Sequence, residues 1–189
     1  MGLSVAVYCG SRFGDRPTYA LVARTLGRLI AERGGSVVYG GGRVGLMGAV
    51  ADAALAAGGQ VVGVIPQALM DREVGHAGLS ELHVVQTMHE RKQLMAERAD
   101  VFIALPGGIG TLEEIFEVWS WQQLGYHDKP VALLNVDGYY DALLEFMRTS
   151  HERGFVSAPQ YHALLVDDDP ARLLDRLALA AAWQRALGA

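Results

Sequence analysis

Short apolar runs alternate with longer segments that carry apolar residues at helical spacing along nearly the whole chain. Apolar runs bounded by glycine or proline are typical of buried strands, and apolar residues three or four positions apart indicate amphipathic helices. The strands predicted in this way cover residues 3–9, 36–39, 61–65, 82–85, 101–105, 131–135 and 164–166. The predicted helices cover a segment that starts after a capping Asp15 and ends at Gly34, and residues 46–57, 88–98, 112–124, 139–153 and 170–187.

This alternation predicts βαβ units and hence a parallel sheet. Because crossovers between parallel strands are right-handed, we expect helices on both faces of the sheet. The predicted fold class is therefore α/β, a Rossmann-like doubly wound parallel sheet, and residues 1–189 are expected to form one domain. Ligands of such folds bind where loops leave the carboxyl ends of the strands, and the three glycine-rich loops of this chain all fall at such ends.

The glycine-rich stretch at residues 105–114, which reads LPGGIGTLEE, joins a predicted strand to a predicted helix. Gly107, Gly108 and Gly110 allow positive φ and let a ligand approach without a Cβ in the way. Thr111 is expected to cap the helix, and its hydroxyl can also face a ligand. The N–H groups of the first helical turn, together with the helix dipole, predict an anion site here.

Two carboxylates, Glu113 and Glu114, directly follow this predicted anion site. A phosphate needs no carboxylate beside it, so the pairing indicates a phosphate anchor next to a catalytic acid or base. Adjacent helical positions point about a quarter-turn or more apart, so the two glutamates are expected to face different surroundings. Glu117 shares the face of Glu114 and is expected to be a solvated or hydrogen-bonding neighbour.

A second glycine loop, residues 40–45, formally satisfies the pattern G-x-G-x-x-G of dinucleotide-binding folds. A dinucleotide site would also need an acidic residue near Ile65 to hold a ribose, and the chain continues there with Pro66 and Gln67. The loop also does not follow the first strand, so NAD or FAD binding is disfavoured. Two interpretations stay open: a tight turn with close helix packing, or a loop that contacts a nucleotide.

Bulk composition narrows the function classes further. The formal net charge of −5 argues against broad binding to nucleic acid or membrane, so any anion site must be built locally. The single cysteine, Cys9, excludes an internal disulfide, fits a reducing compartment, and is expected to be a small buried strand-end residue. Neither a secretory leader nor a membrane-spanning run is evident, so we expect a cytoplasmic protein. The six histidines form no metal-binding pattern, so no metal site is expected.

Four separated segments together resemble the LOG ("Lonely guy") family. Residues 106–114 match its signature PGGxGTxxE, and residues 88–92, which read MHERK, resemble its arginine–lysine segment. Residues 9–11 (CGS) resemble its first loop, and residues 39–42 (YGGG) with 45–48 (GLMG) resemble its second. Four motifs in the right order are far more specific than any one of them, and they span nearly the whole chain.

The resemblance implies the fold predicted above and a cytokinin riboside 5'-monophosphate phosphoribohydrolase. Such an enzyme hydrolyses the N-glycosidic bond of a nucleoside 5'-monophosphate to ribose 5-phosphate and a free base, N6-substituted adenine or, from AMP, adenine. The resemblance also implies that no cofactor is needed, that the protein is a homodimer, and that Arg91 and Glu114 are catalytic. The substrate-binding residues that it implies are Ser11, Gly42, Glu73, Arg91, Lys92, Gly108, Ile109, Gly110, Thr111, Leu112, Glu113, Glu114 and Ser120.

Some of these assignments rest on partial agreement. The residues around Glu73 depart from the family pattern, and Ser120 stands where the family often has threonine, so that only the hydroxyl is kept. From the residues alone, an isolated pair such as Arg91 and Lys92 is expected to face solvent, although its place at the start of a helix after the fourth strand points it at the same crevice. The aromatic residues after the glycine-rich stretch, Phe116, Trp119 and Trp121, are expected in the core or at a subunit interface.

Two other functions stay open. Rossmann-like proteins with similar glycine loops can hold a nucleotide or a cofactor without chemistry, and such a carrier module would bind its ligand but release no base. A pyridoxal-phosphate decarboxylase would need a Schiff-base lysine, for which the chain offers only Lys92 and Lys129.

Overall fold

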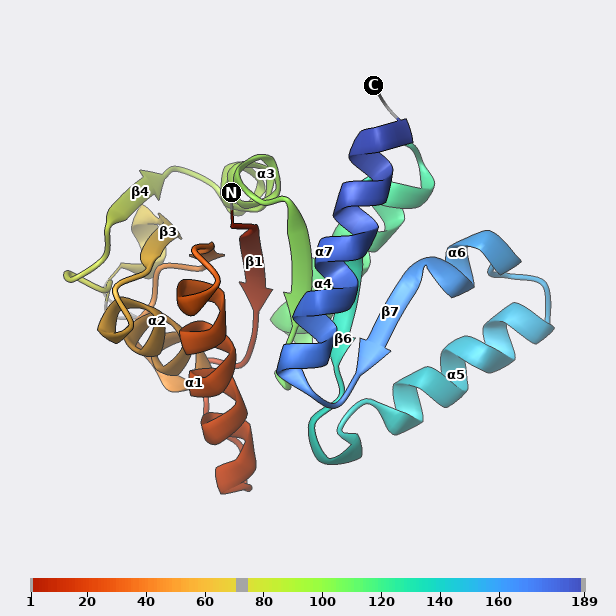
Figure 1. Ribbon diagram of the computed structural model, residues 1–189, viewed down its shortest axis with the longest axis horizontal. Coiled ribbons are helices and arrows are strands. Elements are labelled where there is room, and N and C mark those ends of the chain that lie inside the picture. The colour runs from red at the N-terminus through yellow and green to blue at the C-terminus, as the bar shows by residue number, and fades with distance from the viewer. Residues whose placement is uncertain (1, 71–74, 188–189) are drawn as a thin grey trace.

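A single sheet of seven parallel strands forms the centre of the computed structural model, which describes residues 2–70 and 75–187 (Figure 1). The strands are β1 (Ser4–Tyr8), β2 (Ser36–Tyr39), β3 (Gln60–Pro66), β4 (Glu81–Val85), β5 (Val101–Ala104), β6 (Val131–Leu134) and β7 (Leu164–Asp167). They lie in the order β4-β3-β2-β1-β5-β6-β7, and each pairing is parallel. The predicted Rossmann-like α/β class is confirmed.

Helices cover both faces of the sheet. In the described residues they are α1 (Pro17–Glu32), α2 (Gly45–Ala56), α3 (Met88–Arg98), α4 (Ile109–Gln123), α5 (Asp141–Glu152), α6 (Ala158–Ala163) and α7 (Pro170–Leu187). One apolar layer joins α1, α2 and α7 to the sheet, and Val5 and Val7 of β1 point into it. The other joins α3, α4 and α5 to the opposite face, into which Ala6 and Tyr8 point, because successive residues of a strand face opposite sides.

The chain changes direction across the sheet between β1 and β5. The strands from β1 to β4 are laid down outward on one side, and β5, β6 and β7 follow on the other side of β1. Such a reversal makes the loops after β1 and β5 diverge, which opens a crevice at the carboxyl ends of these strands. The fold thus places the loop after β1, residues 10–14, and the loop after β5, residues 105–111, on the two sides of one crevice.

Three local expectations differ from the structure. The helix after β5 begins at Ile109, three residues before the predicted start at Leu112, and its N-cap is Gly108, so the expectation that Thr111 caps it is wrong. The first helix begins after an extended Arg16 without a side-chain cap, so Asp15 does not cap it. The short helix α6 was not predicted, because its six residues are too few to show a helical period.

No helix of the described ranges 2–70 and 75–187 is long and apolar enough to cross a bilayer.

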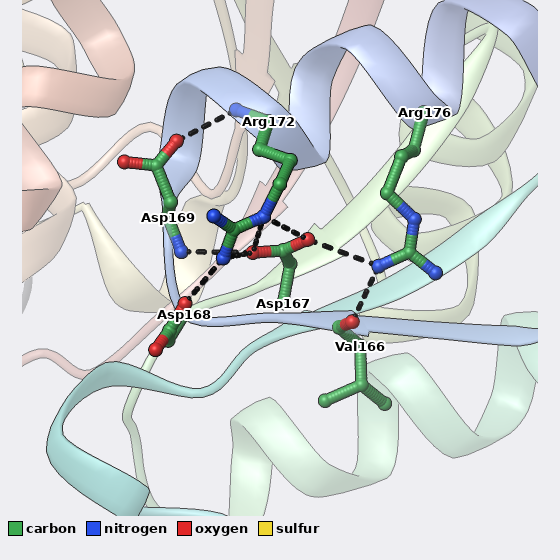
Figure 2. Close-up of polar contacts among 6 residues, drawn as sticks. All are labelled: Val166, Asp167, Asp168, Asp169, Arg172 and Arg176. Carbon is green, nitrogen blue, oxygen red and sulfur yellow. Dashed lines mark hydrogen bonds and ion pairs between the residues drawn. The ribbon is translucent and has the colours of Figure 1, made fainter.

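The end of β7 is tied to the start of α7 by charged side chains (Figure 2). The buried carboxylate of Asp167 accepts hydrogen bonds from Nε of Arg172 at 2.9 Å and from Nη1 of Arg176 at 3.0 Å. The backbone N–H of Asp169 donates to the same carboxylate at 3.0 Å, and the Asp169 side chain accepts the backbone N–H of Arg172 at 2.7 Å. The N-terminus of α7 is therefore capped by the chain itself.

Candidate active site

Backbone hydrogen bonds hold the glycine-rich loops together at the carboxyl ends of β1, β2 and β5. The N–H of Gly10 donates to the carbonyl of Pro106 at 3.0 Å, and the N–H of Leu46 donates to the carbonyl of Gly10 at 3.0 Å. This close approach needs glycine, because a Cβ at Gly45 would lie 2.3 Å from the carbonyl carbon of Ser11. The three loops therefore meet in one place, as the positions of the glycines predicted.

A cavity of about 600 Å³ opens between the loop after β1 and the loop after β5. It lies at the point where the strand order reverses, and its volume is in the range of roughly 300–1,000 Å³ that is typical of small-molecule sites. Among the predicted binding residues, Ser11, Gly108 and Ile109 line it. The remaining lining residues are Gly10, Arg12, Phe13, Gly14, Tyr19, Leu46, Pro106, Gly107 and Tyr139.

The N-terminus of α4 forms one wall of this cavity. Gly108 is the N-cap and has no side chain that could occupy the first N–H groups of the helix, which lack partners within a helix. A Cβ added at Gly108 or Gly110 would meet nothing within 4 Å, so both residues face open space. Thr111 lies buried in the first turn, where its Oγ1 packs against Gly107. The helix dipole and the first-turn N–H groups are thus presented to an anionic ligand.

Arg91 is buried although it lies in the first turn of α3, with 4% of its surface exposed. Its Nη2 donates to the carbonyl of Gly40 at 3.0 Å, and its Nε donates to the carbonyl of Val64 at 3.2 Å. The interpretation as a solvent-facing basic residue is therefore wrong for Arg91. A guanidinium fixed by the loop after β2 and by β3 is a preorganised positive charge beside the glycine loops.

Glu114 is half-buried in α4, on the side of the sheet that carries α3. Burial raises the pKa of the Tyr8 hydroxyl well above its usual range, the charges of Glu114 and Glu117 raise it further, and the charge of Arg91 lowers it. Burial and the charge of Glu114 also raise the pKa of the Cys9 thiol. The charges of Glu114 and Arg91 are therefore both felt at the buried hydroxyl of Tyr8, at the end of β1. Cys9 is a poor nucleophile, because its raised pKa keeps the thiol protonated.

Lys92 bridges the two helices that carry Arg91 and Glu114. Its Nζ lies 3.0 Å from Oε1 of Glu113 and 3.0 Å from Oε1 of Glu117. Burial lowers the pKa of Lys92, but the hydrogen bonds with the two glutamates outweigh burial and raise it. Glu117 is thus a hydrogen-bonding neighbour, one of the two outcomes expected for it, and Glu113 faces Lys92.

Apart from Ser11, Gly108 and Ile109, no predicted binding residue within the described ranges lines this cavity, and that includes Arg91 and Glu114. Gly42 is buried in the loop after β2, where it forms an isolated antiparallel β-bridge with Gly75. Leu112 is half-buried near the start of α4. Ser120 is exposed and lies about 13 Å beyond Thr111 along the axis of α4, so one chain does not bring it to the glycine loop. Glu73 lies outside the described residues.

Two residues in this region have roles that the motif analysis missed. A Cβ at Gly40 would lie 1.9 Å from Nη2 of Arg91, so this glycine leaves room for the guanidinium. Tyr139 lines the cavity and follows the turn formed by Asp137 and Gly138 after β6. An Asp-Gly pair three residues after a strand is a turn signal at the same edge of the sheet, and it could have drawn attention to Tyr139.

Neither lysine is presented to this cavity. Lys92 is held by two glutamates, and Nζ of Lys129 donates to the carbonyl of Ala96 at 2.7 Å. A Schiff-base lysine needs a lowered pKa beside the substrate. The pKa of Lys92 is raised. Burial lowers the pKa of Lys129, but its amine is bound to carbonyl groups of α3 and does not line this cavity. Within residues 2–70 and 75–187, no group of three or more His, Cys, Asp or Glu side chains is placed to hold a metal ion.

Comparison with known proteins agrees with these features. Residues 47–177 match the family model described as "Possible lysine decarboxylase". The chain is 49% identical over 179 residues to "Probable cytokinin riboside 5'-monophosphate phosphoribohydrolase LOG4" of Oryza sativa subsp. japonica, which covers 95% of this chain and 78% of that one. It is 48% identical over 173 residues to "Cytokinin riboside 5'-monophosphate phosphoribohydrolase LOG5" of Arabidopsis thaliana, with 92% and 76% covered.

A solved structure shares the fold at lower identity. The molybdenum cofactor binding protein from the phototrophic bacterium Rippkaea orientalis superposes with a TM-score of 0.70 at 23% identity, over 94% of this chain and 96% of that one. At this identity the likeness shows a common fold and carries no ligand over. The plant proteins match at more than twice this identity and over more than nine-tenths of this chain. Together with the signature at residues 106–114, this match shows that the chain belongs to the LOG family of cytokinin riboside 5'-monophosphate phosphoribohydrolases.

Proposed function

We propose that this protein hydrolyses the N-glycosidic bond of nucleoside 5'-monophosphates and releases ribose 5-phosphate and the free base. Its substrates are cytokinin riboside 5'-monophosphates, after which the plant relatives are named, and AMP. One observation carries the proposal: the N-terminus of α4 has a glycine N-cap and open space beside Gly108 and Gly110, and the same helix carries Glu114 one turn later.

The 5'-phosphate binds at the N-terminus of α4. The backbone N–H groups of Gly108, Ile109, Gly110 and Thr111 and the helix dipole attract it, and Ser11 contributes its hydroxyl from the opposite loop. The phosphate is remote from the bond that breaks, so its binding energy serves to orient the ribose. Substrates without the phosphate should therefore react poorly, because they lose orientation as well as affinity.

Glu114 and Arg91 act on the two sides of the breaking bond. Loss of the base develops positive charge on the ribose, which the carboxylate of Glu114 stabilises while it orients the attacking water. The water oxygen joins the anomeric carbon of the ribose, and its proton goes to the departing base. Arg91 is buried and permanently charged, so it stabilises the negative charge that develops on the leaving base.

The remaining predicted residues support this arrangement. Lys92, through Glu113 and Glu117, holds α3 and α4 together and so keeps Arg91 and Glu114 at a constant separation. Ile109 and Leu112 flank the phosphate site with apolar surface. Gly42, in the second glycine loop, and Glu73 and Ser120, outside the four motifs, are assigned to substrate binding by the family resemblance alone.

Product chromatography after incubation with AMP and, separately, with isopentenyladenosine 5'-monophosphate tests the proposal. Adenosine and isopentenyladenosine, which lack the phosphate, are the matched controls. We expect free base from both monophosphates and at least about 100-fold less from the ribosides, because a charged binding group is lost. Binding of the monophosphates without release of base would instead identify a carrier module.

We also propose that the protein works as a homodimer. The support is a second cavity of about 580 Å³ beside α3 and α4, lined by Trp121 and Tyr126, together with the exposed Leu124. Apolar surface that the chain itself leaves uncovered is typical of subunit interfaces. Light scattering should give twice the chain mass, and Tyr126→Asp should shift it to the monomer. A wild-type protein of chain mass at micromolar concentration would contradict the proposal.

The protein is further proposed to act in the cytoplasm and to use residues 1–189 as one domain. The buried, unpaired Cys9 fits a reducing compartment. The joining of all seven described strands in one sheet fits a single folding unit. Fractionation of cells that express the protein tests the first proposal, and a single unfolding transition tests the second.

A further inference from the structure

Three consecutive carbonyl groups of the phosphate loop, here residues 105–111, each accept a hydrogen bond from a different donor. The hydroxyl of Tyr140 donates to the carbonyl of Leu105 at 2.6 Å. The N–H of Gly10 donates to the carbonyl of Pro106 at 3.0 Å, and the hydroxyl of Tyr139 donates to the carbonyl of Gly107 at 2.5 Å. The oxygens of the loop are thus held by the protein, at the point where the loop turns into α4.

The bond from Tyr139 bears on how the loop meets an anion. A trans peptide is planar, so the carbonyl of Gly107 and the N–H of Gly108 point in opposite directions. Both residues are glycines, for which rotation of this peptide plane is sterically cheap. Without a partner for the Gly107 oxygen, the plane could turn its carbonyl toward the cavity and its N–H away from it. A carbonyl oxygen that faces a phosphate repels it, whereas an N–H attracts it.

Tyr139 is held in place independently of any ligand. The turn that precedes it contains Asp137 at φ 51° and Gly138 at φ 71°, and a positive φ is uncommon for a residue other than glycine. The side chain of Asn135 accepts the N–H of Tyr140 at 2.7 Å, which anchors the end of this turn. The ring of Tyr139 packs edge-on against Tyr19 and Tyr140, with centroids 5.8 Å and 4.9 Å away. The hydroxyl therefore reaches Gly107 from a fixed position.

The two tyrosines differ in their surroundings. Tyr140 is 1% exposed and ties down the end of a core strand, which is a structural task. Tyr139 is 42% exposed, lines the cavity and contacts the loop where it faces the ligand. We propose that Tyr139 is a positioning residue that fixes the Gly107–Gly108 peptide so that the N–H of Gly108 points at the substrate phosphate. This inference rests on the proposed function, namely that the loop binds a 5'-phosphate.

The test is Tyr139→Phe, which removes the hydroxyl and keeps the ring contacts. We expect KM and the calorimetric Kd for AMP to rise about three- to tenfold, the effect of one hydrogen bond, while kcat changes by less than about twofold. The Kd for inorganic phosphate should rise by the same factor. Residual cleavage of adenosine, which has no phosphate, should stay unchanged. Tyr161→Phe, which removes a hydroxyl from a ring stacked on His151 far from the loop, is the matched control.

Tyr140→Phe separates positioning from stability. It should lower the melting temperature more than Tyr139→Phe does, because its hydrogen bond is buried. A Tyr139→Phe protein that binds AMP and inorganic phosphate as tightly as the wild type would overturn the positioning role and leave the phosphoribohydrolase proposal intact. An equal loss of rate on AMP and adenosine would also overturn it. A wild-type protein that binds neither AMP nor inorganic phosphate would overturn both proposals.

Discussion

The helices α4 and α7 begin at the same edge of the sheet, but only the N-terminus of α7 is capped and surrounded by charged side chains of the chain itself. At the start of α7, Asp169 caps the helix, and Asp167 accepts hydrogen bonds from Arg172 and Arg176, so the charges are neutralised within the chain (Figure 2). At the start of α4, the N-cap is Gly108, and the space beside it is open. The strands β5 and β7, which precede them, are parallel members of one sheet, so both helix dipoles point the same way.

The difference lies in what each helix N-terminus leaves available to a ligand: the chain caps α7 itself and places no capping side chain on α4. The three consecutive carboxylates at residues 167–169 would repel an anion at α7, whereas the glycines before α4 bring no competing oxygen. Glu114, proposed to be catalytic, is half-buried further along α4, and Arg91 is buried on α3. The same helix geometry is therefore neutralised by the chain at one end of the sheet and left open at its middle.

The largest effect is expected at the carboxylate behind the uncapped helix. Glu114→Gln should lower kcat for AMP by about 1,000-fold, because the amide cannot stabilise positive charge on the ribose, while the melting temperature changes little. Base release and a thermal melt measure the two quantities. Glu32→Gln, an exposed glutamate on α1, is the control. A Glu114→Gln enzyme with nearly normal kcat would show that the α4 region binds but does not catalyse.

A second substitution makes the α4 terminus resemble that of α7. Gly108→Asp places a capping carboxylate where the phosphate should bind, in a backbone conformation that an aspartate can adopt. We expect kcat/KM for AMP to fall on the order of 100-fold through KM, with an unchanged or slightly higher melting temperature. Gly108→Ala, whose methyl group meets open space, should cost less than about threefold. Equal activity of both variants would place the phosphate elsewhere.

A third change reaches Arg91 without replacing it. Gly40→Ala puts a methyl group 1.9 Å from the present position of Nη2, so the guanidinium must move. A displacement of about 1 Å should lower kcat/KM roughly 10- to 100-fold, in the direction of Arg91→Lys. Steady-state kinetics of the two variants and their double mutant measure this, and the two losses should not add. Full activity of Gly40→Ala would mean that the position of Arg91 is not critical.

A substitution at the end of β7, where Asp167 pairs with Arg172 and Arg176, should lower stability without changing activity. Asp167→Asn removes the charge that Arg172 and Arg176 contact and should lower the free energy of unfolding by about 2 kcal/mol, with kcat/KM unchanged. Urea unfolding and AMP hydrolysis, measured on one preparation, separate the two effects. If activity fell in parallel with stability, the two ends of the sheet would be coupled rather than independent.

The smallest effect is the pH dependence of this pairing. The guanidinium of Arg172 beside Asp167 holds the pKa of that carboxyl well below its usual range. The unfolded chain, with a pKa of about 3.9, therefore binds the proton first, so the stabilisation is complete above about pH 4 and is lost as the pH falls further. The stability gap between wild type and Asp167→Asn should shrink between pH 7 and pH 3. A constant gap would assign the effect to packing.

Most of the fold could be predicted because its signals are local. The spacing of apolar residues in β2 and in α3 identifies a strand and a helix within four and eleven residues, with bounds that the structure repeats. The predicted start of α4 was too late for a physical reason. Ile109 and Gly110 form the first turn of the helix but do not pack against the sheet, and the side chain of Ile109 is 87% exposed. Periodicity therefore marked only the part of α4 that packs against the sheet.

The site was predictable to the extent that glycines mark it. The loop at residues 105–111 was recognised from its composition, and Arg91 from a motif. The motif could not show that Arg91 is buried, because its partners are carbonyl groups 27 and 51 residues away along the chain. Tyr139 could not be assigned for the same reason, since it meets Gly107 across 32 residues.

The sequence by itself determined the alternation of strands and helices, the edge of the sheet at which the glycine-rich loops meet, and the start of α4 without a capping side chain. These follow from patterns within a few residues, where side-chain period and the freedom of glycine act locally. Only the tertiary structure decided which charged side chains pair with one another and which loop carbonyls accept hydrogen bonds from distant side chains. Those choices depend on contacts between distant segments, and the packing of the helices on the two faces of the sheet creates them.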